Sequence, residues 1–446
     1  MELAKNSCDV RKTDPFEHDV KNLSFRSIDP AFVFLEKLLQ RKSKFDVAVC
    51  DLPETIVLKV FSYLDENQLC KVAAVCTNWR RIAYDSSLWT RVDLRRYNSR
   101  VDNLRLIKLI RTRFAPLLTS LNLGSFTVSP QVFQAMCKYC PKLTIMGLEG
   151  VTFVNNFNVS SQSFPQGLKK LDIRHARGDV TAFRKIAQSL KGIECLGLSD
   201  ELFDCLEREL ELEPLFRKFE NIQVLEFSYC CLMNDEMIML IGSYCTMLKS
   251  LCLRRCNNVR GRSLAHLLRN CIALTSLVLD GTGLTNLNIL EIPWEDTTVQ
   301  ELDLSWCRHI NQDGLSFMLP RLPKLRYLRL CCCGYGHAIT DDVLSLMVLR
   351  GCTKLEVLDL SYNSLLTNRG LGNFVTHCRS LLYLRIHHCK DLTKDLMKFF
   401  PGNSNVFVVA NFPVTHKGLV VRGNPVYTFW PSPVSMRTVS LESEMY

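Results

Sequence analysis

Cysteine and histidine side chains are the groups in this sequence whose types and spacing suggest chemistry. The candidates are Cys137 and Cys140 in a C-x-x-C motif, the run Cys331, Cys332 and Cys333 with His337, and the group His387, His388 and Cys389. Paired thiols support redox chemistry, and thiols with imidazoles bind zinc. Zinc requires four ligands in tetrahedral geometry, and these spacings differ from paired zinc knuckles. We therefore expect structural cysteines, no metal site and no cofactor.

Other catalytic motifs are absent from the sequence. It contains no phosphate-binding glycine loop, zinc-protease helix signature or nucleophile elbow. The formal net charge is +10, but lysine and arginine are scattered and form no basic stripe interleaved with aromatic residues. These features predict a non-catalytic protein that does not bind nucleic acid.

The compartment is indicated by what the sequence lacks. The N-terminal segment has no apolar core of signal-peptide length, and no run of eighteen apolar residues occurs. We therefore expect a cytoplasmic or nuclear protein that does not enter a membrane. In such a reducing compartment, the 21 cysteines are expected to be thiols.

A repeated leucine motif covers most of the chain and would position any functional side chain. The pattern L-x-x-L-x-L recurs every 25 to 30 residues. It starts at Leu118, Leu143, Leu168, Ile193, Ile222, Leu248, Leu274, Val299, Leu325, Leu355 and Leu381, with a weaker copy at Val406. This period resembles the leucine-rich repeat, in which each unit supplies a short strand and a returning helix.

Stacking of such repeats predicts an α/β solenoid. One unit cannot bury its own apolar face, so neighbouring units stack, with parallel strands on the concave side of an arc and helices outside. The segments between motifs carry apolar residues at three- and four-residue spacing, which is typical of amphipathic helices.

The cysteines follow the same period. Cys230, Cys256, Cys307, Cys333 and Cys389 stand eight residues after a motif start, with Thr282 and Asn363 in equivalent positions, while Cys140, Cys245, Cys271, Cys352 and Cys378 stand three residues before one. This arrangement resembles the cysteine-containing subclass of the repeat. The resemblance implies that small side chains fill the turn after the strand and close the helix.

A short apolar segment before the repeats has a different texture. Asp51, Pro53 and Glu54 resemble the start of a capped helix, Asp65 and Gln68 form a second capping box, and Thr77 is a candidate cap for a third helix. Three short helices bury little surface. We therefore expect this unit to complete its core with a partner.

The same segment resembles an F-box, the module by which substrate receptors attach to a Skp-type adaptor and the cullin of a ubiquitin ligase. The matching positions are Leu52, Pro53, Ile56, Val60, Phe61, Leu64, Leu69, Val72, Val75, Cys76, Trp79, Leu88 and Trp89. With repeats downstream, the chain resembles an F-box and leucine-rich-repeat protein. The resemblance implies a small all-α domain followed by the solenoid.

The F-box resemblance implies a set of adaptor-binding residues. The predicted contacts are Leu52, Pro53, Ile56, Val60, Phe61, Leu64, Leu69, Val72, Val75 and Cys76. The alternative is that these residues pack only against the first repeat. Trp79 and Trp89 are expected to lie inside the unit or against the linker, because large aromatic residues commonly anchor small cores.

The concave surface supplies the candidate substrate site. Side chains between the leucines face this surface. One row reads Glu226, Cys252, Val278, Asp303, Arg329, Asp359 and Arg385, and a second reads Tyr229, Arg255, Gly281, Trp306, Cys332, Tyr362 and His388. We predict a protein-binding surface centred on Trp306, Arg329, Tyr362, Arg385 and His387. The alternatives are lateral ion pairs in the first row and mutual packing in the second.

These features divide the chain into five segments. They are a flexible N-terminus at 1–45, an F-box at 46–94, a linker helix and repeat cap at 95–117, a solenoid of about 11–12 repeats at 118–412, and a tail at 413–446. Phe429 and Trp430 in the tail are expected to dock on the solenoid.

The leading functional hypothesis is the substrate-recognition subunit of a Skp/cullin/F-box ubiquitin ligase, with a Skp-type adaptor, a cullin and a protein substrate as partners. The alternatives are a ligase-independent protein-binding scaffold or inhibitor, and an enzyme that uses the thiol and histidine cluster.

Overall fold

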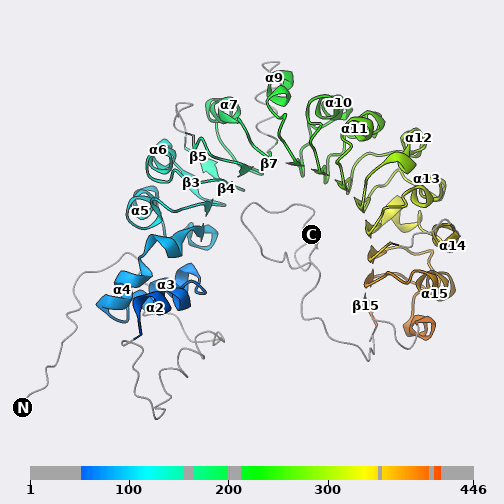
Figure 1. Cartoon of the computed structure of the whole chain (residues 1–446). Helices are drawn as coiled ribbons and strands as arrows, with labels where there is room; N and C mark the ends of the chain where they lie inside the picture. Colours follow the sequence, from blue (N-terminus) through cyan, green and yellow to red (C-terminus); the bar gives the residue numbers. More distant parts are fainter. Residues whose placement is uncertain are drawn as a thin grey trace, which may run out of the picture.

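A helical unit at the N-terminal end continues into a long arc of strands and helices (Figure 1). The computed structural model describes residues 52–154, 164–198, 200, 212–349, 354–400 and 406–412. The predicted N-terminal segment 1–45, the tail with Phe429 and Trp430, and the cap residue Asp51 lie outside the described residues.

The N-terminal helical unit contains three short α-helices. They are α2 (Glu54–Phe61), α3 (Glu66–Ala73) and α4 (Thr77–Ala83), followed by a 3-10 turn at Ser86–Trp89. The capping box of α3 is confirmed, because Asp65 accepts from the backbone N–H of Gln68 and the Gln68 side chain accepts from that of Asp65. The other two helix starts differ from the prediction.

The cap of α2 lies two residues later than the predicted Asp51, and the cap of α4 lies one residue earlier than the predicted Thr77. Pro53 is the N-cap of α2 rather than part of its first turn, which suits a residue without an N–H to donate. The N-cap of α4 is Cys76, whose sulfur accepts from the N–H of Trp79 at 3.4 Å, and Thr77 is the first helical residue.

A single parallel sheet of 13 strands lines the inside of the arc, with the strands in chain order. They are β1 (Arg91–Asp93), β2 (Ser120–Asn122), β4 (Ile145–Gly147), β6 (Lys170–Asp172), β7 (Cys195–Gly197), β8 (Val224–Glu226), β9 (Ser250–Cys252), β10 (Ser276–Val278), β11 (Glu301–Asp303), β12 (Tyr327–Arg329), β13 (Val357–Asp359), β14 (Tyr383–Ile386) and β15 (Phe407–Ala410). The second leucine of each motif pairs with its equivalent in the next repeat, as for Leu277 and Leu302. The predicted solenoid is confirmed.

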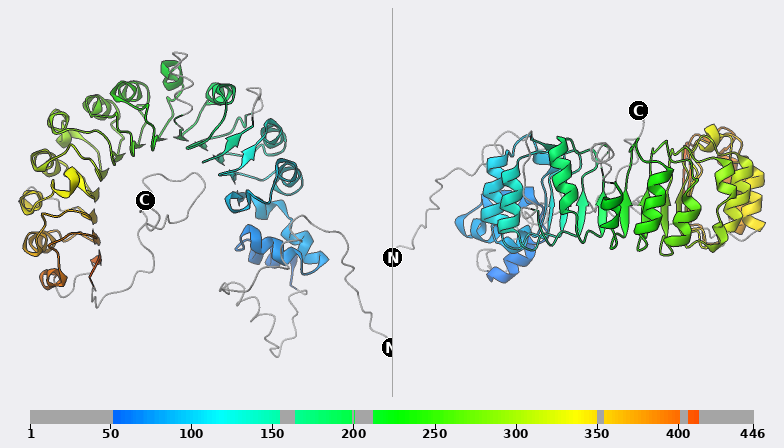
Figure 2. Two further views of the ribbon diagram at one scale, coloured as in Figure 1. Left: turned by 180° about the vertical axis from the view of Figure 1, so that it is seen from behind. Right: turned by 90° about the horizontal axis from the view of Figure 1, so that it is seen from above.

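Helices cover the outside of the arc (Figure 2). They are α5 (Asn103–Leu109), α6 (Pro130–Tyr139), α7 (Val180–Ser189), α9 (Leu212–Arg217), α10 (Asp235–Tyr244), α11 (Leu264–Asn270), α12 (Asn286–Leu290), α13 (Gln312–Met318), α14 (Asp341–Leu349) and α15 (Asn368–His377). Strands β3 (Thr127–Val128) and β5 (Thr152–Phe153) form a second, two-stranded sheet. The leucines between the two layers form one apolar core that runs from Val57 to Val408.

The sheet begins earlier than the predicted solenoid start at residue 118. Strand β1 lies within the segment assigned to the F-box and pairs with β2, Val92 opposite Leu121. Trp89, Val92 and Leu94 occupy the three apolar positions of the repeat motif, and all three are buried. The first repeat therefore starts at the end of the N-terminal helical unit and leaves no separate linker.

The periodic cysteines close the turns after the strands. The thiols of Cys256, Cys307, Cys333 and Cys389 each donate to a strand-end carbonyl of the preceding repeat at 3.0 to 3.1 Å. Thr282 and Asn363 in the same position also donate to strand-end carbonyls. Burial raises the pKa of the Cys307 thiol to about 12, so the thiol keeps the proton that it donates. The predicted structural role is thus accompanied by a hydrogen bond.

The residue before each of these positions adopts a left-handed backbone conformation. Positive φ values occur at Ser125, His175, Tyr229, Arg255, Trp306, Cys332, Tyr362 and His388, and at the equivalent Gly150 and Gly281. The N–H of this residue donates to a carbonyl of the following repeat, as from Arg255 to Asp280 and from Trp306 to Cys331. We call this series the turn row. Its backbone hydrogen bonds tie adjacent repeats together.

Candidate protein-binding surfaces

The first candidate surface is an apolar strip on the N-terminal helical unit. Ile56 and Val60 on α2 are 49% and 36% exposed, Tyr63 after α2 is 76% exposed, and Val75 before α4 is 61% exposed. Pro53 is also exposed. Apolar side chains at this density on one small unit are typical of a protein-binding site. We call Pro53, Ile56, Val60, Tyr63 and Val75 the apolar strip.

Three residues predicted to contact an adaptor lie in the core instead. Phe61, Leu69 and Val72 are buried, and Phe61 packs edge to face on Trp79 with ring centres 5.4 Å apart. These side chains hold the three helices together, so they are withdrawn from the contact set. Leu52, Leu64 and Cys76 are half-buried and pack against the core from its rim.

Tyr63 is a surface residue that the sequence prediction omitted. It follows Ile56 by seven residues and Val60 by three, which is the spacing of one helical face. This spacing was sufficient to identify it. Lys59 lies over the Tyr63 ring at 5.5 Å and leaves most of the ring exposed.

The N-terminal helical unit shares its core with the first repeat. The indole N–H of Trp89 donates to the carbonyl of Ala83 at 2.8 Å, and its ring lies 5.9 Å from that of Phe114. The Arg113 guanidinium stacks 3.8 Å from the centre of the Tyr84 ring. Trp79 and Trp89 are buried, as predicted. Packing against the repeat thus uses this set, and the apolar strip remains exposed.

Comparisons with known proteins match both parts of this architecture. Residues 49–95 match the F-box-like family model. The chain is 25% identical over 344 residues to human "F-box/LRR-repeat protein 12", covering 68% of this chain and 96% of the relative. It is also 25% identical over 388 residues to "F-box protein SKIP17" of Arabidopsis thaliana, covering 82% of this chain and 67% of the relative. The chain carries an F-box followed by leucine-rich repeats.

Among solved structures, "Crystal structure of Rad7 and Elc1 complex in yeast" aligns with 76% of this chain and 90% of that chain. The sequence identity is 16% and the TM-score is 0.39, which is too low to inform on function.

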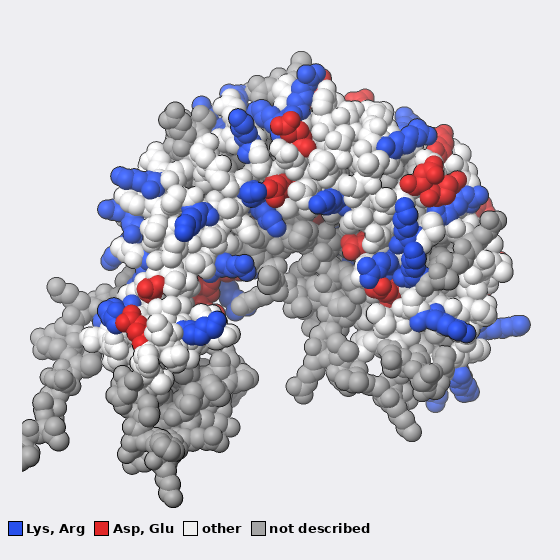
Figure 3. Space-filling model, viewed as in Figure 1, with Lys and Arg blue, Asp and Glu red and all other residues white. Residues whose placement is uncertain are grey.

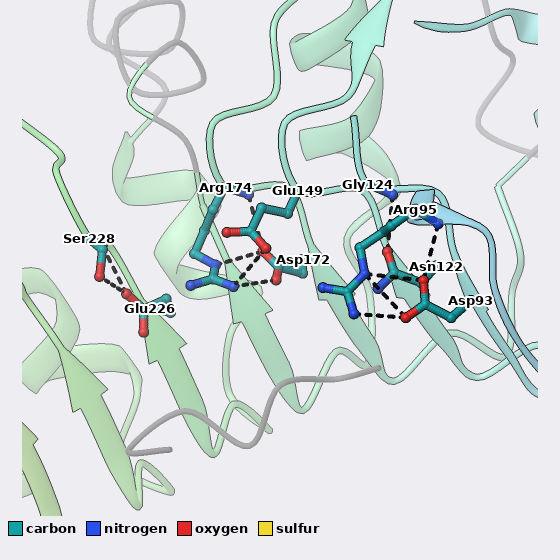
Figure 4. Close-up of polar contacts among 9 residues, drawn as sticks. All are labelled: Asp93, Arg95, Asn122, Gly124, Glu149, Asp172, Arg174, Glu226 and Ser228. Carbon is teal, nitrogen blue, oxygen red and sulfur yellow. Dashed lines mark hydrogen bonds and ion pairs between the residues drawn. The ribbon is translucent and has the colours of Figure 1, made fainter. Parts of the chain in front are cut away.

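The concave surface of the repeats is the second candidate. Its polar side chains at the strand ends mostly make local hydrogen bonds (Figure 4). The carboxylates of Asp93, Asp172 and Glu226 each accept from the backbone N–H two residues later. Asp303 and Asp359 make the same bond to Ser305 and Ser361. These acids therefore stabilise the turn that follows each strand.

The arginines of the predicted substrate surface pair with these acids. Arg329 lies 3.4 Å from Asp303, and Arg385 lies 3.8 Å from Asp359, between side chains opposite each other on adjacent strands. Both carboxylates are buried, and both arginines are about one-fifth exposed. The lateral ion pairs named as the alternative are thus present. The charges that remain accessible to a partner are those of the guanidinium groups.

Aromatic residues of the turn row stack along the edge of the arc. The rings of Trp306 and Tyr362 are 5.9 Å apart, and those of Tyr362 and His388 are 4.6 Å apart and nearly parallel. His387 shares a hydrogen bond of 2.6 Å with Asn411. The structure thus brings Trp306 and Tyr362 together and places His387 against Asn411, the residue that follows the last strand. These residues remain predicted partner contacts.

Asp280 is a buried carboxyl group on this surface with a raised pKa. Burial, reinforced by nearby Asp303, raises its pKa to about 7, although Arg254 lies 3.2 Å away. One of its oxygens accepts no hydrogen bond among the described residues. A raised pKa means that the folded state binds more protons than the unfolded chain between about pH 4 and pH 7.

Titration of Asp280 should therefore lower the free energy of unfolding as the pH rises from about 4 to about 7. Above pH 7 it should cause no further change. Asp280→Asn should remove this contribution and stabilise the protein at pH 8 by at most about 4 kcal/mol, with little effect near pH 4. Urea unfolding at several pH values measures the difference, with exposed Asp342→Asn as the control. Identical pH dependence of wild type and Asp280→Asn would contradict this prediction.

The remaining chemistry candidates lie within the repeats. Among the described residues, no group of three or more potential metal-ligating side chains is close enough to hold an ion. Burial raises the pKa of Cys137 to about 11 and that of Cys140 to about 12, so both thiols stay protonated near neutral pH. No helix in the described ranges has the length and hydropathy to cross a membrane.

Surface charge is mixed on the face viewed in Figure 3. Lysine and arginine are spread over the arc with acidic residues between them.

Proposed function

We propose that this chain is the substrate-recognition subunit of a Skp/cullin/F-box ubiquitin ligase. The observation that carries the proposal is the apolar strip, which lies on the helices that match the F-box-like model and is left uncovered by the first repeat. An apolar surface of this kind is stabilised by a partner that removes it from water. The partner is a Skp-type adaptor, and the cullin joins through the adaptor.

The repeats hold the protein substrate. Solenoids of this class present an extended concave surface, and here its rim carries Trp306, Tyr362 and accessible arginines. Aromatic and arginine side chains contribute disproportionately to protein interfaces. In this role the chain positions a substrate for ubiquitin transfer and performs no chemical step itself.

The adaptor contacts comprise the apolar strip with Leu52, Leu64 and Cys76 at its rim. Co-purification of the full chain with the adaptor and cullin, compared with the variant Leu52→Ala/Pro53→Ala, tests this assignment. We expect the variant to lose both partners and to keep proteins held by the repeats. Persistence of the cullin would contradict the assignment.

A ligase-independent scaffold is the alternative that the same experiment separates. In that case the wild-type chain would recover proteins bound by the repeats without adaptor or cullin, and the F-box variant would behave identically. The apolar strip favours the ligase subunit, because exposed apolar side chains on the helices that match the F-box-like model are expected to bind a partner protein.

A further inference from the structure

A pocket of about 240 Å³ opens beside the turn row, across the strand-end turns of β9, β10 and β11. Its lining includes Arg255, Asn257, Gly281, Trp306, Arg308 and His309. Three successive repeats therefore contribute to one depression in the surface.

Two glycines allow neighbouring groups to pack closely at the pocket wall. A Cβ atom at Gly281 would lie 2.6 Å from Cδ of Arg255, and one at Gly283 would lie 2.4 Å from the carbonyl oxygen of Asn257. Because Gly281 has no side chain, Arg255 extends across its repeat, and its guanidinium reaches a point 5.4 Å from the centre of the Trp306 ring. Arg255 and Trp306 thus meet although a whole repeat separates them.

The backbone does not require these large side chains. Arg255 and Trp306 both have φ of 58°, a conformation that costs a non-glycine residue about 1 to 2 kcal/mol. The hydrogen bond from this position uses only the main-chain N–H, and Gly281 makes it equally well. The side chains of Arg255 and Trp306 therefore have a role other than forming this backbone hydrogen bond.

The pocket carries an excess of positive charge. No carboxylate lines it, whereas two guanidinium groups and an imidazole do. The Asp280 carboxylate lies 3.9 Å from Arg255 and 3.2 Å from Arg254. One negative charge is therefore shared between two arginines. Arg308 is exposed, lies 5.6 Å from the Tyr335 ring and has no ion-pair partner in the described part of the chain. The positive charges of Arg255 and Arg308 are both close enough to Cys332 to oppose the rise in its pKa that burial causes.

We propose that this pocket binds an anionic group of a partner peptide, a carboxylate or a phosphate, held by Arg255 and Arg308 and flanked by Trp306. Guanidinium groups bind both anions through charge-assisted hydrogen bonds, and the indole supplies an apolar surface for the neighbouring peptide residue. The inference deepens the proposed function by giving the substrate a chemical signature, and it rests on that function for the identity of the peptide as a substrate.

Binding of the purified full chain to short peptides with randomised flanks tests the pocket. Three libraries carry phosphoserine, glutamate or serine at the central position. We expect the wild-type chain to prefer at least one anionic library over the serine library by about tenfold. Arg308→Gln and Arg255→Gln should each lose this preference, and Arg379→Gln, at an exposed position on another repeat, should retain it.

The pattern of results identifies the anion. Preference for phosphoserine alone supports a phosphate, and equal preference for glutamate supports a carboxylate. Absence of any anionic preference, or a preference that survives Arg308→Gln, would overturn the proposal. Melting temperatures of the variants establish that they are folded.

Co-purification of the adaptor with the same proteins separates the two proposals. Arg308→Gln should keep wild-type adaptor binding. A wild-type chain that binds anionic peptides through Arg308 but recovers no adaptor would overturn the substrate-receptor function and leave the anion site standing.

Discussion

Replacing Ile56 and Val60 together with aspartate is expected to weaken adaptor binding by at least about 100-fold, or roughly 3 kcal/mol. Both side chains are exposed on α2, so the folded chain tolerates the change. In the complex, each carboxylate would be transferred from water into an apolar contact without a counterion, which is strongly unfavourable. Titration of purified adaptor into the full chain, followed by calorimetry, measures the loss.

The matched control places the same charge on an exposed apolar residue elsewhere. Ile272 is 74% exposed beyond α11, and Ile272→Asp should bind adaptor as the wild type does. Wild-type affinity in the double variant would show that the apolar strip serves another purpose and would remove the main support for the proposed function.

Trp89→Ala is expected to destabilise the chain by about 3 to 5 kcal/mol, the usual cost of deleting a buried tryptophan side chain. The substitution removes the ring packed on Phe114 and leaves the carbonyl of Ala83 without its donor. Because Trp89 ends the N-terminal helical unit and begins the first repeat, both parts lose packing at once. The free energy of unfolding in urea, measured without adaptor, gives the size of the effect.

Trp89→Phe distinguishes packing from hydrogen bonding. It keeps an aromatic ring but has no N–H for Ala83, so a smaller loss of about 1 to 2 kcal/mol is expected. If Trp89→Ala unfolds at the same urea concentration as the wild type, the N-terminal helical unit and the first repeat do not depend on their shared core for stability.

The solenoid was predictable because its period also determines its register. Leucines at a constant interval must fall opposite one another when repeats stack, and Leu251, Leu277 and Leu302 do so. The first strand was not predicted, because its motif reads "WTRVDL", with Trp89 in place of the first leucine. A search that accepts any large apolar residue at that position would have found it.

The candidate surfaces were less predictable, for two physical reasons. A short amphipathic helix shows which residues are apolar, but it does not divide them between its own core and a partner. Phe61 and Val60 are adjacent in sequence, yet one is buried and the other exposed. On the repeats, the pairing of Asp303 with Arg329 could be predicted from the strand register. The contact of Arg255 with Trp306 across Gly281 could not, because it depends on side-chain conformations and not on the repeat period.

The shared core between the N-terminal helical unit and the first repeat links assembly to survival of the protein. A ligand that binds only the folded form stabilises it by mass action, so an adaptor seated on α2 would also protect the strands joined to β1. Under the proposed function, chains made in excess of adaptor would lack this protection and be cleared first by cellular quality control. The abundance of the chain would then follow the supply of adaptor without any dedicated sensor.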